Sequence, residues 1–257
     1  MARGLYCVLI AGILSLMFPF AAVATEVRQA RIAFVGDSMA DGLWGAMFRR
    51  IGKNKCLAKK ITLIRKAKNG TGLARLDQFN WVEEIETLSE GGNIDLFVGS
   101  FGINDRQAIV EPDKTRVEFG SPQFDARYKA VLSEAVQDAL SQGSSVLVVG
   151  LPVMMDQAAN ADAVAKNKLF AEVMKDIGSD HASYAPPWSS TSGEDRYRPY
   201  LPNTNNAQIE VRARDGVHFT PAGYDMVLNA LFPAIREALK LRGQEPTPDC
   251  EHDVSAK

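Results

Sequence analysis

The sequence lacks an excess of charge of either sign, and it is poor in cysteine and histidine. Lysine and arginine together number 29 and aspartate and glutamate 31, which gives a net charge of -2. A chain so balanced has no general attraction for a polyanion, so we predict no nucleic-acid partner. Its three cysteines and three histidines leave few soft metal ligands. His218 has Asp215 nearby but no third ligand at a useful spacing, so the sequence predicts no metal site.

Long apolar runs are also scarce, and the one that exists lies at the N-terminus. Residues 5–20 are almost wholly apolar, Arg3 precedes them, and Ala22-Val23-Ala24 follows. The pattern predicts a secretory signal peptide over residues 1–24, cleaved before Thr25. An uncleaved membrane anchor is the less favoured alternative, because the run is short for a membrane span. No later segment is apolar enough for stable membrane insertion, so we predict a secreted, periplasmic protein.

Removal of the signal peptide would take Cys7 with it and leave two cysteines. Cys56 lies early in the chain and Cys250 lies near its C-terminus. In an oxidising compartment the two could form a disulfide bond. The sequence leaves this open, because spacing alone does not show whether their Cα atoms are close enough.

Apolar stretches alternate with amphipathic stretches along the rest of the chain. This alternation predicts one doubly wound α/β domain over residues 25–257 with a mostly parallel sheet. Residues 186–214 show no periodicity and are expected to form a long loop or a small insertion, and residues 243–257 a loose tail unless Cys250 is bonded. The strands are expected at 31–35, 60–67, 94–101, 145–151 and, more weakly, 182–184, and the helices at 41–53, 78–90, 124–142, 162–177 and 221–241.

Residues with chemical function stand where the predicted strands end. In a parallel sheet the carboxyl ends of the strands share one edge, which is where ligands bind. Residues far apart in sequence can therefore meet at that edge. They are Ser38 after the first strand, Gly70 and Gly72 after the second, Asn104 after the third, and Asp215 and His218 before the last helix.

These residue types are the ones that nucleophilic catalysis by serine requires. The hydroxyl of Ser38 needs a base, and His218 is the natural base because imidazole titrates near neutral pH. Asp215 can orient the imidazole. The N–H of Ser38, an N–H of the glycine turn and the amide of Asn104 are candidate donors to an oxyanion, each typically contributing about 3 kcal/mol.

Each of these residues also has a simpler explanation. Ser38 could be only a helix N-cap, and Asn104 could only form an Asx-turn. Asp37 is expected to accept backbone N–H groups in the turn. The segment around Ser38 lacks the glycine fingerprint and the lysine of a nucleotide site. The combination, rather than any one residue, favours catalysis.

Four short blocks together resemble the SGNH hydrolases, also called the GDSL family. They are Gly36-Asp37-Ser38, the turn with Gly70 and Gly72, Gly102-Ile103-Asn104-Asp105, and Asp215-Gly216-Val217-His218. The resemblance covers essentially the whole mature chain. It implies a flavodoxin-like three-layer α/β/α sandwich with a mostly parallel five-stranded sheet, no cofactor, and ester hydrolysis or acyl transfer.

A secreted bacterial branch of that family, of largely uncharacterised function, is more similar still. The shared motifs are Thr71-Gly72-Leu73-Ala74-Arg75, residues 102–107 and residues 215–220. The branch motif favours Gly72 as the oxyanion glycine, whereas the distance from the second strand favours Gly70. Leu76 stands where the branch tends to have proline, a difference that we regard as structural.

The sequence thus predicts a serine esterase that hydrolyses a small, acetyl-like ester on an envelope or extracellular carbohydrate. Three alternatives stay open: an O-acyltransferase with the same triad, a lipase or thioesterase, and a non-catalytic glycan-binding or assembly protein. The expected partner is a small-molecule or glycan ester, and protein partners are not identified. Candidate substrate contacts are Trp44, Asp105, Arg106 and Arg196.

Overall fold

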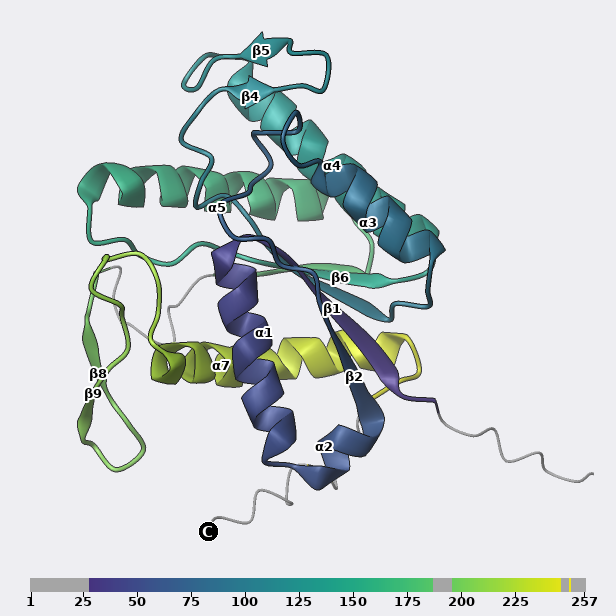
Figure 1. Cartoon of the computed structure of the whole chain (residues 1–257), viewed down its shortest axis with the longest axis vertical. Coiled ribbons are helices and arrows are strands. Elements are labelled where there is room, and N and C mark those ends of the chain that lie inside the picture. Colours follow the sequence, from purple (N-terminus) through teal and green to yellow (C-terminus); the bar gives the residue numbers. More distant parts are fainter. Residues whose placement is uncertain (1–27, 187–195, 246–249, 251–257) are drawn as a thin grey trace, which may run out of the picture.

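A five-stranded, all-parallel sheet forms the centre of the protein. The computed structural model describes residues 28–186, 196–245 and 250 (Figure 1). The sheet order is β2-β1-β3-β6-β7, which confirms the predicted parallel sheet and its short fifth strand. The strands are β1 (Ala30–Gly36), β2 (Ile61–Arg65), β3 (Leu96–Ser100), β6 (Ser145–Val149) and β7 (Ala182–Ala185).

Both faces of the sheet are buried, which is why its strands are continuous apolar runs. On β1, Ala33 and Val35 belong to the core on one face, and Ile32 and Phe34 to the core on the other. Residues of β1 also pair with both neighbours, so that Ile32 lies opposite Leu96 of β3. Because β1 is held by a neighbouring strand on each side, its carboxyl end, where Gly36 leads into Asp37 and Ser38, has a fixed position in the sheet.

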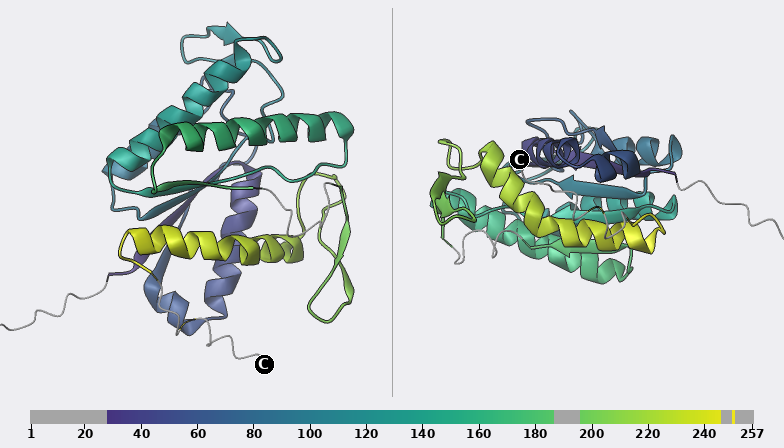
Figure 2. Two further views of the ribbon diagram at one scale, coloured as in Figure 1. Left: turned by 180° about the vertical axis from the view of Figure 1, so that it is seen from behind. Right: turned by 90° about the horizontal axis from the view of Figure 1, so that it is seen from below.

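Helices cover both faces and complete the predicted three-layer sandwich. Figures 1 and 2 show α1, α2 and α7 on one side of the sheet and α3, α4 and α5 on the other, in agreement with the two apolar cores. The helices are α1 (Ser38–Gly52), α2 (Lys55–Lys60), α3 (Trp81–Glu90), α4 (Phe124–Ser141), α5 (Gln157–Ile177) and α7 (Pro221–Leu241).

Three predicted helix starts were wrong, because capping side chains set them. Helix α1 begins at Ser38 rather than at residue 41, since the side chain of Asp37 accepts the N–H of Met39. Asp156 caps α5, which therefore starts before the predicted residue 162. Asn80 caps α3 later than predicted. The short helix α2 was not predicted at all.

Two small antiparallel hairpins lie outside the main sheet. Strands β4 (Ile109–Val110) and β5 (Arg116–Val117) pair in a stretch between β3 and α4 where no strand was predicted. Strands β8 (Tyr200–Pro202) and β9 (Gln208–Glu210) pair within the predicted long loop. The hairpin of β8 and β9 projects beside the first turns of α7 (Figure 1).

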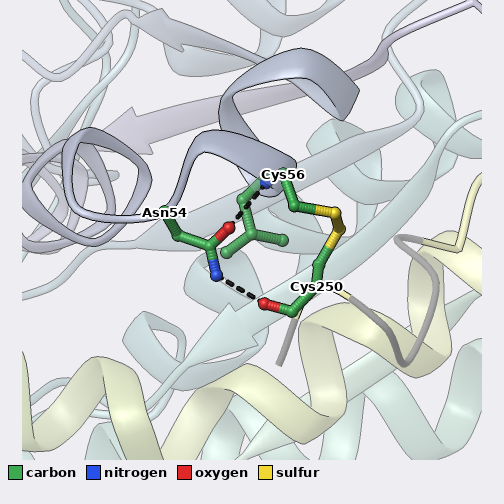
Figure 3. The surroundings of a disulfide bond; sticks show 4 residues. Asn54, Cys56 and Cys250 are labelled. Atoms are coloured by element: carbon green, nitrogen blue, oxygen red, sulfur yellow. Dashed lines mark hydrogen bonds between the residues drawn. A yellow bond between two sulfur atoms is a disulfide. The ribbon is translucent and has the colours of Figure 1, made fainter. Parts of the chain in front are cut away.

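A disulfide bond joins Cys56 of α2 to Cys250, with their Cα atoms 5.2 Å apart. Asn54 lies between the two segments, as Figure 3 shows. Its side chain accepts the N–H of Leu57 at 2.9 Å and donates to the carbonyl oxygen of Cys250. The pairing that the sequence left open is thus present, and it attaches this part of the tail to α2.

The predicted signal peptide, residues 1–24, lies outside the described residues. Among the helices that the structure describes, none is both long enough and apolar enough to cross a membrane.

Candidate active site

Ser38 and His218 meet at the carboxyl edge of the sheet. Ser38 is the first residue of α1, and only Asp37, which is the helix cap, separates it from β1. The Oγ atom of Ser38 lies 2.6 Å from Nε2 of His218. The residues come from opposite ends of the chain, yet the parallel sheet brings them into hydrogen-bond contact.

Asp215 orients the other side of the imidazole. Its Oδ2 lies 2.7 Å from Nδ1 of His218, and its Oδ1 accepts the N–H groups of Val217 and His218, both at 2.9 Å. Gly216 has a positive φ of 71°, which lets the chain turn tightly between the two side chains. An ionised Asp215 holds the proton on Nδ1 and leaves Nε2 as the acceptor that faces Ser38.

The Asp215 carboxyl is held in its charged form. Partial burial opposes ionisation, but hydrogen bonds from the imidazole and from the N–H groups of Val217 and His218 outweigh it and lower the pKa of Asp215 to about 2. The Asp215 side chain is 49% exposed and that of His218 35%, so the site is open to solvent.

Arg212 holds this loop in place, which the sequence analysis missed. Its guanidinium is buried and donates to the carbonyl oxygens of Val153 at 2.6 Å and Val217 at 2.8 Å. Burial lowers the pKa of Arg212 to about 10. The residue lies in the predicted irregular loop, where an arginine is normally solvated, so the sequence held no signal of this role.

Asn104 contacts the glycine turn. Its amide nitrogen donates to the carbonyl oxygen of Thr71 at 2.8 Å, which leaves a second amide hydrogen for another acceptor. Gly72 is buried beside Thr71, and its N–H has no acceptor among the described residues. Gly70 is exposed and has a positive φ of 78°. Gly72 also packs against Asp105, the residue after Asn104, whereas no atom lies within 4 Å of a methyl group built on Gly70.

Two buried carboxyls lie beneath these residues. Asp37 accepts the N–H groups of Met39 at 2.8 Å and Ile103 at 3.3 Å, as we predicted for this turn. Burial raises the pKa of Asp37 to about 8. Asp105 is also buried, and burial raises its pKa above the ordinary value.

Asp105 requires a correction. We considered it a candidate substrate contact, but its side chain is 1% exposed. Its carboxylate accepts the N–H groups of Leu73 and Ala74 and the hydroxyl of Tyr128. The carboxylate is fully occupied inside the protein, so it has no face to offer a substrate.

The other three candidate substrate contacts lie in different places. Arg106 lines a cavity together with Asn104 and His218. Trp44 lines a second, more open hollow between the start of α1 and the start of α7. Arg196 lines neither of them.

The part of the chain that the structure describes contains no recognisable metal-binding cluster of side chains. Within residues 28–186, 196–245 and 250, no group of three or more histidine, cysteine, aspartate or glutamate side chains is placed to hold a metal ion. The described geometry is instead that of a serine hydroxyl hydrogen-bonded to an oriented imidazole, which is the arrangement that activates serine as a nucleophile.

Comparison with known sequences gives one family match. A family model described as "Protein of unknown function (DUF459)" matches residues 31–234. No curated protein matches the sequence at a significant level.

Solved structures show the same fold at low sequence identity. The inhibitor-bound aryl esterase of M. smegmatis is 15% identical with a TM-score of 0.56, and the match covers 82% of this chain and 100% of that chain. Est24, a carbohydrate acetylesterase from Sinorhizobium meliloti, is 14% identical with a TM-score of 0.53 over 81% and 98% of the two chains. A GDSL-like lipase from Bacteroides thetaiotaomicron is 17% identical with a TM-score of 0.51 over 81% and 89%. These matches confirm the predicted SGNH hydrolase fold.

Proposed function

This chain belongs to the DUF459 family and has the SGNH hydrolase fold, and from that premise we propose that it is a serine esterase. The observation that carries the proposal is the continuous contact from Ser38 Oγ through the imidazole of His218 to the carboxylate of Asp215. A helix cap alone would not need this chain of contacts, because Asp37 already caps α1.

Ser38 is the nucleophile of the proposed reaction. Its Oγ forms a bond to the ester carbonyl carbon while Nε2 of His218 takes its proton. The tetrahedral intermediate then collapses, the bond to the alcohol oxygen breaks, and the alcohol leaves with that proton. A water molecule attacks the acyl-enzyme, with His218 as base and then as acid, and releases the carboxylic acid. Asp215 stabilises the imidazolium in both halves.

The oxyanion is stabilised by three donors on neighbouring elements. We assign the N–H of Ser38, the N–H of Gly72 and the side-chain amide of Asn104. One observation supports Gly72 over Gly70: Gly72 is buried against the carboxyl of Asp105, the residue after Asn104, whereas Gly70 is exposed. Each such donor typically contributes about 3 kcal/mol to the transition state.

The proposed substrate is a small acyl ester, acetyl-like, on an envelope or extracellular carbohydrate. The predicted signal peptide supports a periplasmic location. The similar fold of Est24, itself a carbohydrate acetylesterase, adds support by analogy.

The test is hydrolysis of p-nitrophenyl esters by residues 25–257. Ser38→Ala should lower kcat by at least about 10³-fold, because the nucleophile is lost. Ser141→Ala is a matched control, since Ser141 is exposed near the end of α4 and should leave kcat unchanged. Equal hydrolysis by Ser38→Ala and the natural sequence would refute the mechanism. Analysis of products with a sugar acceptor separates an esterase from an acyltransferase.

A further inference from the structure

A cavity of about 200 Å³ adjoins the residues that would carry the reaction. Asn104 and His218 both line it. Its other walls come from the loop after β3, the loop after β6, the first half of α5 and the loop that carries His218. Any group that enters this cavity therefore lies beside both the base and one oxyanion donor.

Most of the lining side chains are apolar. Leu151, Met154 and Ala163 are buried at 1%, 5% and 2% exposure. The remaining apolar members of the lining are Ile103, Ala159 and Val217. A cavity with these walls favours hydrocarbon over a hydroxylated sugar ring, which would lose its hydrogen bonds to water.

The charged groups of the lining already have partners. Asp162 accepts two hydrogen bonds from Nζ of Lys166, both at 2.5 Å. Arg106, at the exposed side, lies 3.8 Å from Asp156. Among the described residues, the lining therefore holds no unpaired buried charge, because Asp162 is bound by Lys166 and Arg106 is exposed.

The second hollow has a different character. It is lined by Asp41, Trp44, Arg49 and Arg65 as well as Gly42 and Tyr224. Arg65 pairs with Asp41 at 2.7 Å, and its guanidinium lies over the ring of Trp44. Phe219, which follows His218 in the chain, lines this polar hollow too, but neither Ser38 nor His218 does.

We propose that the apolar cavity binds the acyl chain of the ester and that the alcohol part lies outside this cavity. This assignment rests on the proposed esterase function, and it replaces the acetyl-like acyl group proposed above with a longer one. The occupant is a saturated acyl chain of short to medium length. A group the size of a water molecule occupies about 30 Å³, so the cavity holds about six such groups. An acetyl methyl fills only part of it, and a long fatty acyl chain would extend into water.

The expected preference follows from burial. Each additional buried methylene should raise kcat/KM about three- to fourfold until the cavity is full. With p-nitrophenyl acetate, butyrate, hexanoate and octanoate, kcat/KM should rise to butyrate or hexanoate and then stop rising. Ala163→Leu reduces the cavity and should lower kcat/KM for butyrate and hexanoate at least tenfold, with acetate changed less than about twofold.

The matched control is Ala165→Leu. Ala165 lies on the same helix, α5, but is exposed, so this variant should keep the chain-length profile of the natural sequence. Met154→Ala provides a second test that does not depend on overpacking. It enlarges the cavity and should move the preferred ester toward octanoate.

The outcomes separate this inference from the proposed function. Absence of Ser38-dependent hydrolysis of every ester, together with absence of Ser38 labelling by a fluorophosphonate, would refute the esterase function itself. Ser38-dependent hydrolysis whose chain-length profile is the same in folded Ala163→Leu and Met154→Ala would overturn only the cavity assignment. A profile that responds instead to the size of the alcohol in acetate esters would place the alcohol in the cavity and would also overturn it.

Discussion

Gly72 packs directly against the carboxylate of Asp105, so that a methyl group on residue 72 would collide with it. The same carboxylate accepts the N–H groups of Leu73 at 2.9 Å and Ala74 at 3.1 Å. Because Asp105 follows Asn104 in the chain, these contacts fix the glycine turn relative to Asn104. The spacing of the two proposed oxyanion donors therefore depends on the absence of a side chain at residue 72.

Replacement of this glycine should impair catalysis. In Gly72→Ala the turn must move away from Asp105, which displaces the Gly72 N–H from the oxyanion. We expect kcat on p-nitrophenyl acetate to fall about 10²- to 10³-fold, the typical loss for one donor. Steady-state kinetics and urea unfolding of the same samples measure the effect on activity and on stability.

Gly70→Ala is the matched control for that change. A methyl group on residue 70 meets no atom within 4 Å, but the φ of 78° is strained for alanine. The variant should lose about 1 kcal/mol of stability and keep kcat close to that of the natural sequence. A large loss of kcat in Gly70→Ala with normal activity in Gly72→Ala would assign the donor to Gly70 instead.

Stability should depend on the titration of Asp37. Burial raises the pKa of Asp37 to about 8, whereas an aspartate in the unfolded chain titrates near its ordinary value of about 4. Between these values the folded state binds a proton that the unfolded state does not. The contribution of Asp37 is therefore present below pH ~4 and is lost as pH rises toward 8.

Asp37→Asn isolates this contribution, because asparagine is also a good N-cap and does not titrate. The free energy of unfolding of the natural sequence minus that of the variant should decrease from pH 5 to pH 8, by on the order of 1 kcal/mol per pH unit. Asp105 is present in both proteins, so its own burial contributes to both, although its charge also helps to raise the pKa of Asp37. A difference that stays constant over this range would mean that Asp37 is ionised in the folded state throughout.

The position of the site at the carboxyl edge of the sheet was predictable from the sequence, because it follows from the direction of the strands alone. Parallel strands with buried faces are continuous apolar runs, and their carboxyl ends must share one edge. That rule placed Ser38 and His218 together across most of the chain, and Thr220 with Pro221 marked the start of α7. The disulfide remained undecided because it depends on the distance between Cys56 and Cys250, which no local pattern encodes.

The supporting residues of the site were not predictable, because their roles depend on burial. Asp105 and Arg212 are charged residues in polar loops, and in a sequence such residues appear solvent-exposed. Both are buried only because separate segments close over them, such as the glycine turn over Asp105. The predicted starts of α1 and α5 were wrong for a related reason, since Asp37 and Asp156 could each cap a helix or form a turn.

Asp215 should matter for the rate of the reaction rather than for binding. In Asp215→Asn the amide can donate to Nδ1 of His218, which places the imidazole proton on Nε2. A protonated Nε2 can no longer accept the proton of Ser38. We expect kcat to fall about 10³- to 10⁴-fold with little change in KM. Asp225→Asn is the control, because Asp225 lies on α7 and pairs with Arg49. A loss of less than tenfold would show that Asp215 does not orient the base.

The disulfide should contribute to stability and not to activity. It closes a loop between residues 194 positions apart, which restricts the unfolded chain strongly and corresponds to about 5 kcal/mol at most in the chain-entropy model. Measured effects are usually smaller, so we expect the double variant Cys56→Ala, Cys250→Ala to lose about 2–4 kcal/mol in urea unfolding. Cys56 lies on α2, the helix that leads into the N-terminal end of β2, at the edge of the sheet opposite Ser38, so kcat/KM should not change. Asn54→Ala should also lower the free energy of unfolding, by less than the double variant does, because Asn54 links Leu57 to Cys250. Loss of activity at temperatures where the double variant is fully folded would contradict this separation between the disulfide and the site.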